Sequence, residues 1–186
     1  MGYLSETSLK QLGFGHLGRN VKISDKASLY QTQDMIIGDH CRIDDFCVVS
    51  GKITMGRNVY IGPLSLVAGG RPGIVFEDFV TLAWRTQVFT QSDDYSGATM
   101  TNPTIPAAYK NEVEKPVRLG RHSIVGAGSI VGPGVDMGEG TSVGAAALVL
   151  DDTNPWTVYV GSPARRLKDR ERGLLALEQE YLAQDG

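Results

Sequence analysis

The sequence predicts an all-β solenoid, in which short strands and turns wind into stacked coils. Three observations predict it: aliphatic residues recur every six positions, a glycine often follows each of them, and a small residue lies four positions after it. Hexapeptide periodicity is the sequence signature of a β-helix, in which each repeat is a short strand plus a turn. A sandwich or a mixed α/β fold has no fixed period of this kind.

The aliphatic positions run through two stretches of the chain. They are Ile37, Ile43, Val49, Met55, Ile61 and Val67, and then Leu119, Val125, Val131, Met137, Val143 and Val149, with a weaker repeat at Phe76, Leu82 and Val88 between them. We expect these side chains to point inward and to stack on their equivalents in neighbouring coils. The small residue leaves room at each corner, and glycine supplies backbone freedom where a Cβ would clash.

Residues 1–186 are interpreted as a single domain. Residues 1–20 form an N-terminal cap with a short helix, and residues 21–163 form the β-helix. A loop at about 92–116 interrupts the repeat; a loop this long inside a compact array is usually functional or disordered. Residues 164–184 carry leucines among charges, which predicts an amphipathic C-terminal helix.

Composition narrows the function classes. The formal net charge is -3 and no basic stripe appears, so nucleic acid is a poor partner. There is no apolar run long enough to span a membrane and no signal peptide, which favours a soluble cytoplasmic protein. Cys41 and Cys47 both occupy the small-residue position. We expect them to be buried fillers rather than a disulfide or a metal site.

The end of the repeat region carries a resemblance to a known family. Residues 158–166 read Val-Tyr-Val-Gly-Ser-Pro-Ala-Arg-Arg, a strand followed by Gly-x-Pro-Ala and basic residues. Together with the six-residue repeat and the mid-chain loop, this ending resembles the hexapeptide-repeat acyltransferases over about residues 21–166. The resemblance implies a left-handed parallel β-helix, acyl-CoA as co-substrate, and a homotrimer with active sites between subunits.

The loop resembles a subgroup of that family. Residues 92–97 read Ser-Asp-Asp-Tyr-Ser-Gly and residues 101–106 read Thr-Asn-Pro-Thr-Ile-Pro. This is similar to N-acyltransferases of nucleotide-linked 4-amino-4,6-dideoxy sugars, such as the anthrose-pathway type, and to galactoside O-acetyltransferase-like proteins. The resemblance implies transfer of an acyl group, with acetyl as the first expectation, to the amino group of a nucleotide-linked deoxy amino sugar. It also implies a role in the biosynthesis of surface polysaccharides such as lipopolysaccharide.

The choice of proton acceptor follows from a missing histidine. Sugar O-acetyltransferases of this fold use a loop histidine as general base, but the histidines here are His16, His40 and His122, and none lies in the loop. A neutral amine is already nucleophilic, so a carboxylate suffices to accept its proton. Asp93 and Asp94 are therefore candidates, against the equal alternative that the pair forms an Asx-turn. The resemblance to the subgroup implies that at least one of these carboxylates touches the acceptor amine, with Asp93 the first catalytic candidate and Asp94 the second. His122 is the third, against a packing or interface role.

Binding residues are assigned on weaker signals. Trp84, Arg85, Tyr95 and Asn102 are candidates for contacting the acceptor, with a subunit contact as the alternative for Trp84. For coenzyme A, the resemblance implies a groove between C-terminal coils and basic residues beyond the last coil. These positions are Gly126, Ala127, Ala145, Ala146, Arg165, Arg166 and Lys168.

Two other functions stay open at this point. A sugar O-acetyltransferase of the galactoside, maltose or O-antigen type remains, although the absent loop histidine counts against it. A γ-carbonic-anhydrase-like enzyme or a non-catalytic trimeric scaffold ranks lower. A zinc site needs several converging histidines, and the sequence offers no such set, so no metal is expected.

Overall fold

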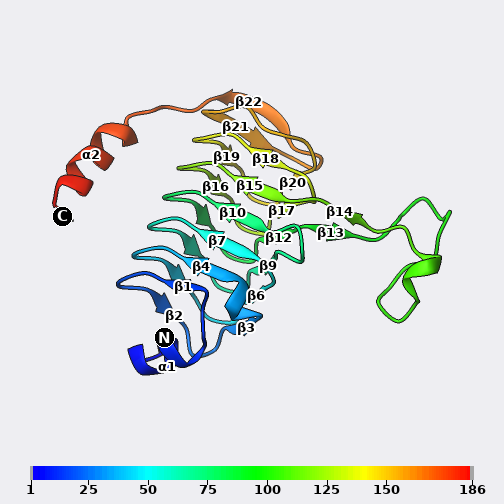
Figure 1. Ribbon diagram of the computed structural model, residues 1–186. Helices are drawn as coiled ribbons and strands as arrows, with labels where there is room; N and C mark the ends of the chain where they lie inside the picture. The colour runs from blue at the N-terminus through cyan, green and yellow to red at the C-terminus, as the bar shows by residue number, and fades with distance from the viewer. Residues whose placement is uncertain (1, 185–186) are drawn as a thin grey trace.

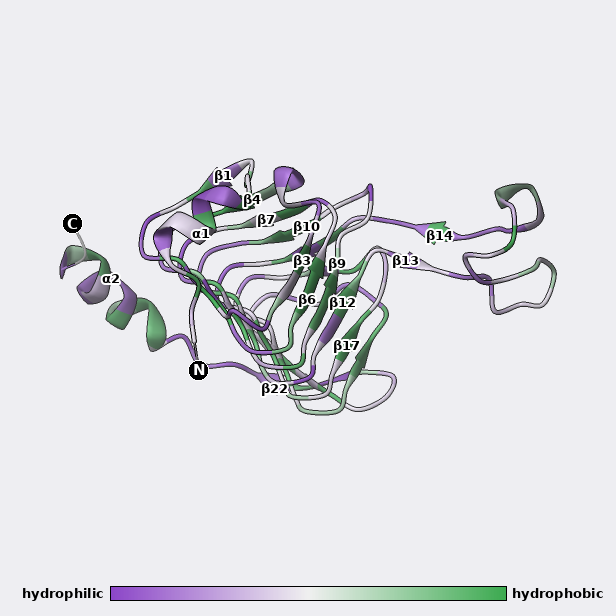
Figure 2. Ribbon diagram, turned by 90° about the horizontal axis from the view of Figure 1, so that it is seen from below, coloured by the Kyte–Doolittle hydropathy of each residue, from purple (hydrophilic) through white to green (hydrophobic). Residues whose placement is uncertain are grey.

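The computed structural model describes residues 2–184 and is a parallel β-solenoid built from three sheets (Figure 1). Through the repeats, successive strands join the three sheets in turn, so each complete coil adds one strand to each sheet. Seen from below, the coils form a roughly triangular tube (Figure 2). The predicted solenoid is confirmed.

The first sheet runs β1 His16–Leu17, β4 Met35–Ile37, β7 Ile53–Met55, β10 Ile74–Phe76, β15 Val117–Leu119 and β18 Asp136–Met137. The second runs β2 Lys22–Ile23, β5 Arg42–Ile43, β8 Tyr60–Ile61, β11 Thr81–Leu82, β16 Ile124–Val125, β19 Ser142–Val143, β21 Thr157–Val160 and β22 Arg165–Asp169. The third runs β3 Ser28–Tyr30, β6 Val48–Ser50, β9 Leu66–Ala68, β12 Gln87–Phe89, β17 Ile130–Val131 and β20 Leu148–Val149. We call the turns from the first sheet to the second the first corner, from the second to the third the second corner, and from the third back to the first the third corner.

The six-residue positions form the core. Equivalent residues pair across neighbouring coils, as in the series Ile61, Leu82, Val125 and Val143 of the second sheet. All the aliphatic positions predicted from the repeat, from Ile37 to Val149, are at most 2% exposed. Removing these side chains from water is the main driving force for stacking the coils.

The small-residue positions are filled as expected. Cys41 and Cys47 are buried and free. Their thiols donate to the backbone carbonyls of Gly56, at 3.0 Å, and Gly62, at 3.1 Å. Burial raises the pKa of the Cys41 thiol to about 11, so it is a packing group rather than a nucleophile.

The N-terminal cap is shorter than predicted. Its helix, α1 Glu6–Gln11, begins where the Ser5 hydroxyl accepts a hydrogen bond from the backbone N–H of Ser8, and it buries Leu9 against the first coils. Strand β1, however, lies inside the 1–20 region and pairs with β4, with Leu17 opposite Ile37. The solenoid therefore starts within the segment that we predicted as cap.

The inserted loop leaves the third corner and projects away from the coils (Figures 1 and 2). Its base is an antiparallel ribbon of β13 Gln91–Ser92 and β14 Val113–Glu114, and it contains a 3-10 turn at Ala107–Tyr109; a second 3-10 turn, Thr32–Asp34, lies at the third corner of an earlier coil. The ribbon was not predicted from the sequence, because strands of two residues are too short to show a period.

The predicted C-terminal helix is wrong for its first ten residues, 164–173. Instead of a helix, β22 turns back and pairs antiparallel with β21. This pairing covers the edge that β21 would otherwise leave open, and an uncovered edge is unfavourable. The helix itself is α2 Leu174–Gln184, on the side of the solenoid opposite the loop (Figure 1). Among residues 2–184 there is no helix long and apolar enough to cross a membrane.

The core repeat can be tested with a pair of leucines. Leu82 is fully buried, whereas Leu177 on α2 is 65% exposed. We expect Leu82→Ala to lower the free energy of unfolding by about 2–5 kcal/mol, because it leaves a cavity between coils. Leu177→Ala is expected to change it by no more than about 0.5 kcal/mol. Urea denaturation followed by circular dichroism measures both; equal losses would contradict the core assignment.

Candidate active site

A cavity of about 450 Å³ lies where the loop leaves the third sheet. Its wall combines the outer face of that sheet with the base of the loop. The lining residues are Gln31, Ser50, Leu66, Ala68, Gly70, Phe89, Thr90, Gln91, Ser92, Asp93, Pro103 and Glu112. An apolar wall beside two carboxylates suits a ligand that carries both apolar surface and an amine.

The two adjacent aspartates differ in their surroundings. Asp94 accepts hydrogen bonds from the backbone N–H of Ser96 and from the Thr99 hydroxyl, both at 2.8 Å. The bonds from Ser96 and Thr99 lower the pKa of Asp94, and they make it the centre of an Asx-turn. Asp93 lines the cavity, and one carboxylate oxygen accepts a bond of 3.3 Å from the backbone N–H of Asn102. Its other oxygen has no hydrogen-bond partner within residues 2–184.

The remaining loop residues have separate roles. The side-chain oxygen of Asn102 accepts from the backbone N–H and hydroxyl of Thr104, so it shapes the loop. Tyr95 is 92% exposed and stands clear of the cavity. Glu112, in contrast, is held by the Gln91 amide at 3.0 Å and by Lys110 at 2.5 Å. Of the loop carboxylates in the cavity, Asp93 is thus the one left to receive a ligand group.

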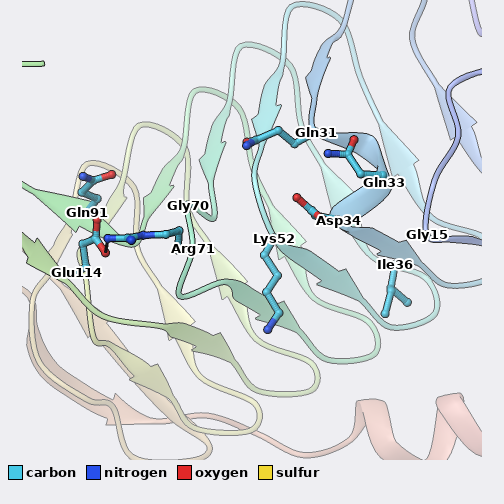
Figure 3. Close-up of a pocket in the computed structure, with 10 residues that line it drawn as sticks. All are labelled: Gly15, Gln31, Gln33, Asp34, Ile36, Lys52, Gly70, Arg71, Gln91 and Glu114. Carbon is cyan, nitrogen blue, oxygen red and sulfur yellow. Dashed lines mark hydrogen bonds and ion pairs between the residues drawn. The ribbon is translucent and has the colours of Figure 1, made fainter.

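A second cavity, of about 650 Å³, lies on the first-sheet side of the third corner (Figure 3). Its lining shares Gln31, Gly70 and Gln91 with the first cavity. It adds charged groups of both signs, since Arg71 binds Glu114 at 2.9 Å and Lys52 and Asp34 stand at the same corner. This cavity could not be predicted from the sequence, because its residues come from separate coils and form no local motif.

His122 lies in the first corner and not near the loop. Its ring is 8% exposed, stacks on Phe79 with centroids 5.0 Å apart, and lies 3.0 Å from a carboxylate oxygen of Glu178. Arg121 also bonds Glu178, and Arg170 donates to the His122 carbonyl at 2.7 Å. These contacts make His122 part of the attachment of α2 to the solenoid.

The other histidine near this corner does not join it. His40 and His122 occupy equivalent first-corner positions, but Asn58 and Phe79 of the intervening coils lie between them. At ~4.8 Å per coil, the two rings are separated by roughly 14 Å. Within residues 2–184 there is no group of three His, Cys, Asp or Glu side chains placed to hold a metal ion.

The second corner collects the other predicted residues. Backbone hydrogen bonds join Gly128 to Trp84 and Ala146 to Ala127, each at 2.9 Å. The sheet register places Trp84, Ala127 and Ala145 in one column, one coil apart. The corner residues Ala127, Gly128, Ala145 and Ala146 are exposed, so they form a shallow track of small side chains.

The basic residues lie at the C-terminal end of this track. Arg165 pairs with Val160 just beyond the hairpin turn, and Arg166 pairs with Tyr159. Both arginines line a cavity of about 150 Å³ beside Leu150. Lys168 lies further along β22, opposite Val158. The structure therefore brings Arg165 and Arg166 to the track and leaves Lys168 farther away.

One chain does not bring Asp93 and the track together. Strand β12 separates the second corner, with Arg85, from the third corner, with Asp93. At about 3.3 Å per residue, the two groups are on the order of 20 Å apart along the third sheet. The candidate site is thus divided into two halves, which lie at opposite ends of the strands of this sheet.

The chain is similar to known proteins in sequence and in structure. Residues 34–69 match the family model described as bacterial transferase hexapeptide (six repeats). Over 184 residues, 97% of this chain and 95% of the relative, the chain is 40% identical to the dTDP-4-amino-4,6-dideoxy-D-glucose acyltransferase of Escherichia coli. The chain belongs to the hexapeptide-repeat acyltransferases of nucleotide-linked amino sugars.

Solved structures of this acyltransferase family superpose closely. AntD, an N-acyltransferase from Bacillus cereus in complex with dTDP and 3-hydroxybutyryl-CoA, matches with a TM-score of 0.96 and 43% identity, covering 98% of this chain and 97% of AntD. A variant of AntD with dTDP-4-amino-4,6-dideoxyglucose and coenzyme A matches with a TM-score of 0.97 and 43% identity, covering 98% of each chain. The predicted family and the predicted sugar acyltransferase activity are confirmed.

The attachment role of His122 gives a test within this acyltransferase. We expect His122→Gln and Glu178→Ala to behave alike, because both remove contacts that hold α2. Each should speed proteolysis at α2 and lower stability by about 1–3 kcal/mol, with kcat within tenfold of wild type. Limited proteolysis and steady-state kinetics measure the two effects. A loss of kcat on the order of 10²-fold or more in His122→Gln alone would instead indicate a general base.

Proposed function

We propose that this protein transfers an acyl group from acyl-CoA to the 4-amino group of a dTDP-linked 4-amino-4,6-dideoxy sugar. The observation that carries the proposal is Asp93, a carboxylate that faces a cavity with one oxygen unoccupied, in a loop without histidine. The substrate in the name of the E. coli relative and the ligands bound to AntD support the choice of nucleotide, sugar and coenzyme.

The chemistry needs one proton acceptor. The lone pair of the neutral amine attacks the thioester carbonyl, forming a C–N bond and an oxyanion. Collapse of this intermediate re-forms the carbonyl and breaks the C–S bond, so the electron pair leaves with the coenzyme A thiolate. Asp93 accepts the proton shed by the nitrogen and passes it to the thiolate. The products are an amide and free coenzyme A, and Asp93 returns to its ionised state.

The acyl-CoA lies along the second corner in this proposal. Ala127, Ala145 and their neighbours leave room for the slim pantetheine arm, and Arg165 and Arg166 at the end of the track meet the phosphates. The thioester then lies toward Trp84. The acceptor occupies the cavity beside Asp93, with its amine at the carboxylate.

Because the two halves lie at opposite ends of the strands of one sheet, we propose that the active form is a homotrimer. Asp93 of one subunit faces the second corner of its neighbour. Large apolar side chains are exposed on the surface that such contacts would cover: Tyr30, Phe46, Val48, Leu64 and Trp84. Monomers rarely expose an apolar patch of this kind without a partner.

The proposed setting is cytoplasmic, since acyl-CoA is a cytosolic donor. An acylated nucleotide sugar is an activated building block that a glycosyltransferase must consume. We propose surface polysaccharide, such as lipopolysaccharide, as its destination.

A thiol-release assay tests the proposed reaction. Purified protein is mixed with acetyl-CoA and with dTDP- and UDP-linked 4-amino and 3-amino sugars, alongside galactosides and maltose. Turnover of a dTDP-linked 4-amino sugar, with amide formation confirmed by mass spectrometry, is the expected result. Turnover confined to a hydroxyl sugar would overturn the N-acylation proposal.

The adjacent aspartates provide a matched pair of variants. We expect Asp93→Asn to lower kcat by about 10²–10⁴-fold, because an amide cannot accept the proton. Asp94→Asn keeps a carbonyl oxygen for the backbone N–H of Ser96, so its loss should stay below about tenfold. Steady-state kinetics at saturating donor measures both. Equal rates for Asp93→Asn and wild type would remove Asp93 from the mechanism.

The composite site predicts complementation between two inactive variants. Asp93→Asn lacks the base, and Ala145→Trp fills the track. In mixed trimers, an intact Asp93 can face an intact track on the neighbouring subunit. In every trimer that contains both variants, one of the three interfaces joins an intact Asp93 to an intact track, so purified mixed trimers should show about a third of the wild-type activity per site.

Co-expression with two affinity tags yields the mixed trimers, and each variant alone is the control. If the site lies within one subunit, every subunit keeps one lesion and the mixture stays inactive. Size-exclusion chromatography with light scattering gives the oligomeric state independently.

A further inference from the structure

The track of small residues at the second corner has two unlike ends. Its C-terminal end carries Arg165 and Arg166. From there the column passes Gly161, Ala145 and Ala127, and the next coil places Trp84 in the same column. Three inter-strand steps of ~4.8 Å give a length of about 14 Å, which is comparable to an extended pantetheine arm. The change from alanine to tryptophan is abrupt.

Trp84 is exposed but its position is fixed. It is 64% exposed, yet a Cβ added to Gly62 in the preceding coil would lie 3.1 Å from the indole Cδ1. The ring therefore rests against the bare backbone of Gly62. The indole also lies close to the Tyr60 side chain, from the same coil as Gly62. A side chain at position 62 would force the ring to move.

A buried ionic group holds Tyr60 in turn. The Tyr60 hydroxyl donates to Asp44 at 2.8 Å. Asp44 is 1% exposed and receives two bonds from the Arg42 guanidinium, at 2.7 and 2.9 Å. A buried carboxylate with this set of partners is expensive to displace, so Tyr60 has little freedom. The exposed tryptophan is thus held in place by packed and hydrogen-bonded neighbours, unlike most exposed side chains.

We infer that Trp84 ends the acyl-CoA track and limits the length of the acyl chain that the enzyme accepts. This inference rests on the proposed function, because it requires acyl-CoA to lie along the second corner. With the phosphates at Arg165 and Arg166, the thioester reaches the coil of Ala127, and the acyl carbons point at the indole. An acetyl group fits before the ring, whereas each further methylene meets it. Trp84 is therefore a specificity-determining residue, and Tyr60 is a positioning residue that acts through it.

The test compares donors of different length in four proteins. Wild type, Trp84→Ala, Trp84→Phe and Phe46→Ala are assayed with acetyl-CoA and butyryl-CoA, and the ratio of the two kcat/KM values is recorded. Phe46 is the matched control, because it is an exposed aromatic of the same corner, two coils before Trp84 and outside the track. Loosening of subunit contacts alone would affect both positions.

Wild type is expected to prefer acetyl-CoA. Trp84→Ala should shift the ratio toward butyryl-CoA by on the order of tenfold or more, as one or two methylenes do in an apolar pocket. Trp84→Phe should give a smaller shift in the same direction, and Phe46→Ala none. Tyr60→Phe loses the hydrogen bond to Asp44 that fixes the ring beside Trp84, and should shift the ratio less than Trp84→Ala does.

Calorimetric titration of the two donors without acceptor separates this inference from the proposed function. If no amino sugar is turned over, the reaction proposal fails, but the ratio of dissociation constants for butyryl-CoA and acetyl-CoA still reports on Trp84. An unchanged ratio in both Trp84 variants, or an equal change in Phe46→Ala, would overturn the inference. A higher KM for the amino sugar with an unchanged donor ratio would also overturn it and place Trp84 at the acceptor.

Discussion

The structure depends on one constraint: each coil lies in register on the one before it. In the second sheet, Ile61, Leu82, Val125 and Val143 pair in sequence, although the inserted loop separates the second from the third by more than forty positions in the chain. The backbone hydrogen bonds of each coil are completed by its neighbours, and the aliphatic side chains fill the interior. Because register is fixed inside, it is also fixed outside. The position of each surface side chain is therefore determined by its corner and its coil.

The interior of this fold could be predicted from the sequence, because a six-residue period is a local property. The buried aliphatic positions and the two buried thiols follow directly from it. The departures have nonlocal causes. Residues 165–169 form a strand because β21 offers an open edge, and the leucines and charges of the segment itself do not record that edge. The ribbon of β13 and β14 likewise depends on distant partners in the chain, since Gln91 pairs with Glu114 and Ser92 with Val113.

The candidate site shows the same division between local and nonlocal information. In the sequence, Asp93 and Asp94 are adjacent candidates ranked first and second, and the hydrogen bonds of Ser96 and Thr99 to Asp94 give the physical difference between them. His122 is ambiguous until Glu178 is seen beside it, 56 positions later in the chain. Trp84 looks like a residue close to the loop, because ten positions or fewer separate them. The register instead places it in the column of Ala127 and Ala145, at the second corner and thus at the other end of the third-sheet strands.

A solenoid of this kind has straight columns but no concave interior, since the core fills the tube. A site that must exclude water and hold two substrates therefore needs a second surface. The loop supplies a carboxylate on an arm that projects from the third corner, and the second corner supplies the small-residue track. The exposed apolar residues of the third sheet and the second corner are unfavourable in a lone chain. Association of copies would bury these residues and would also bring the two half-sites together, so the same contact would serve both stability and catalysis.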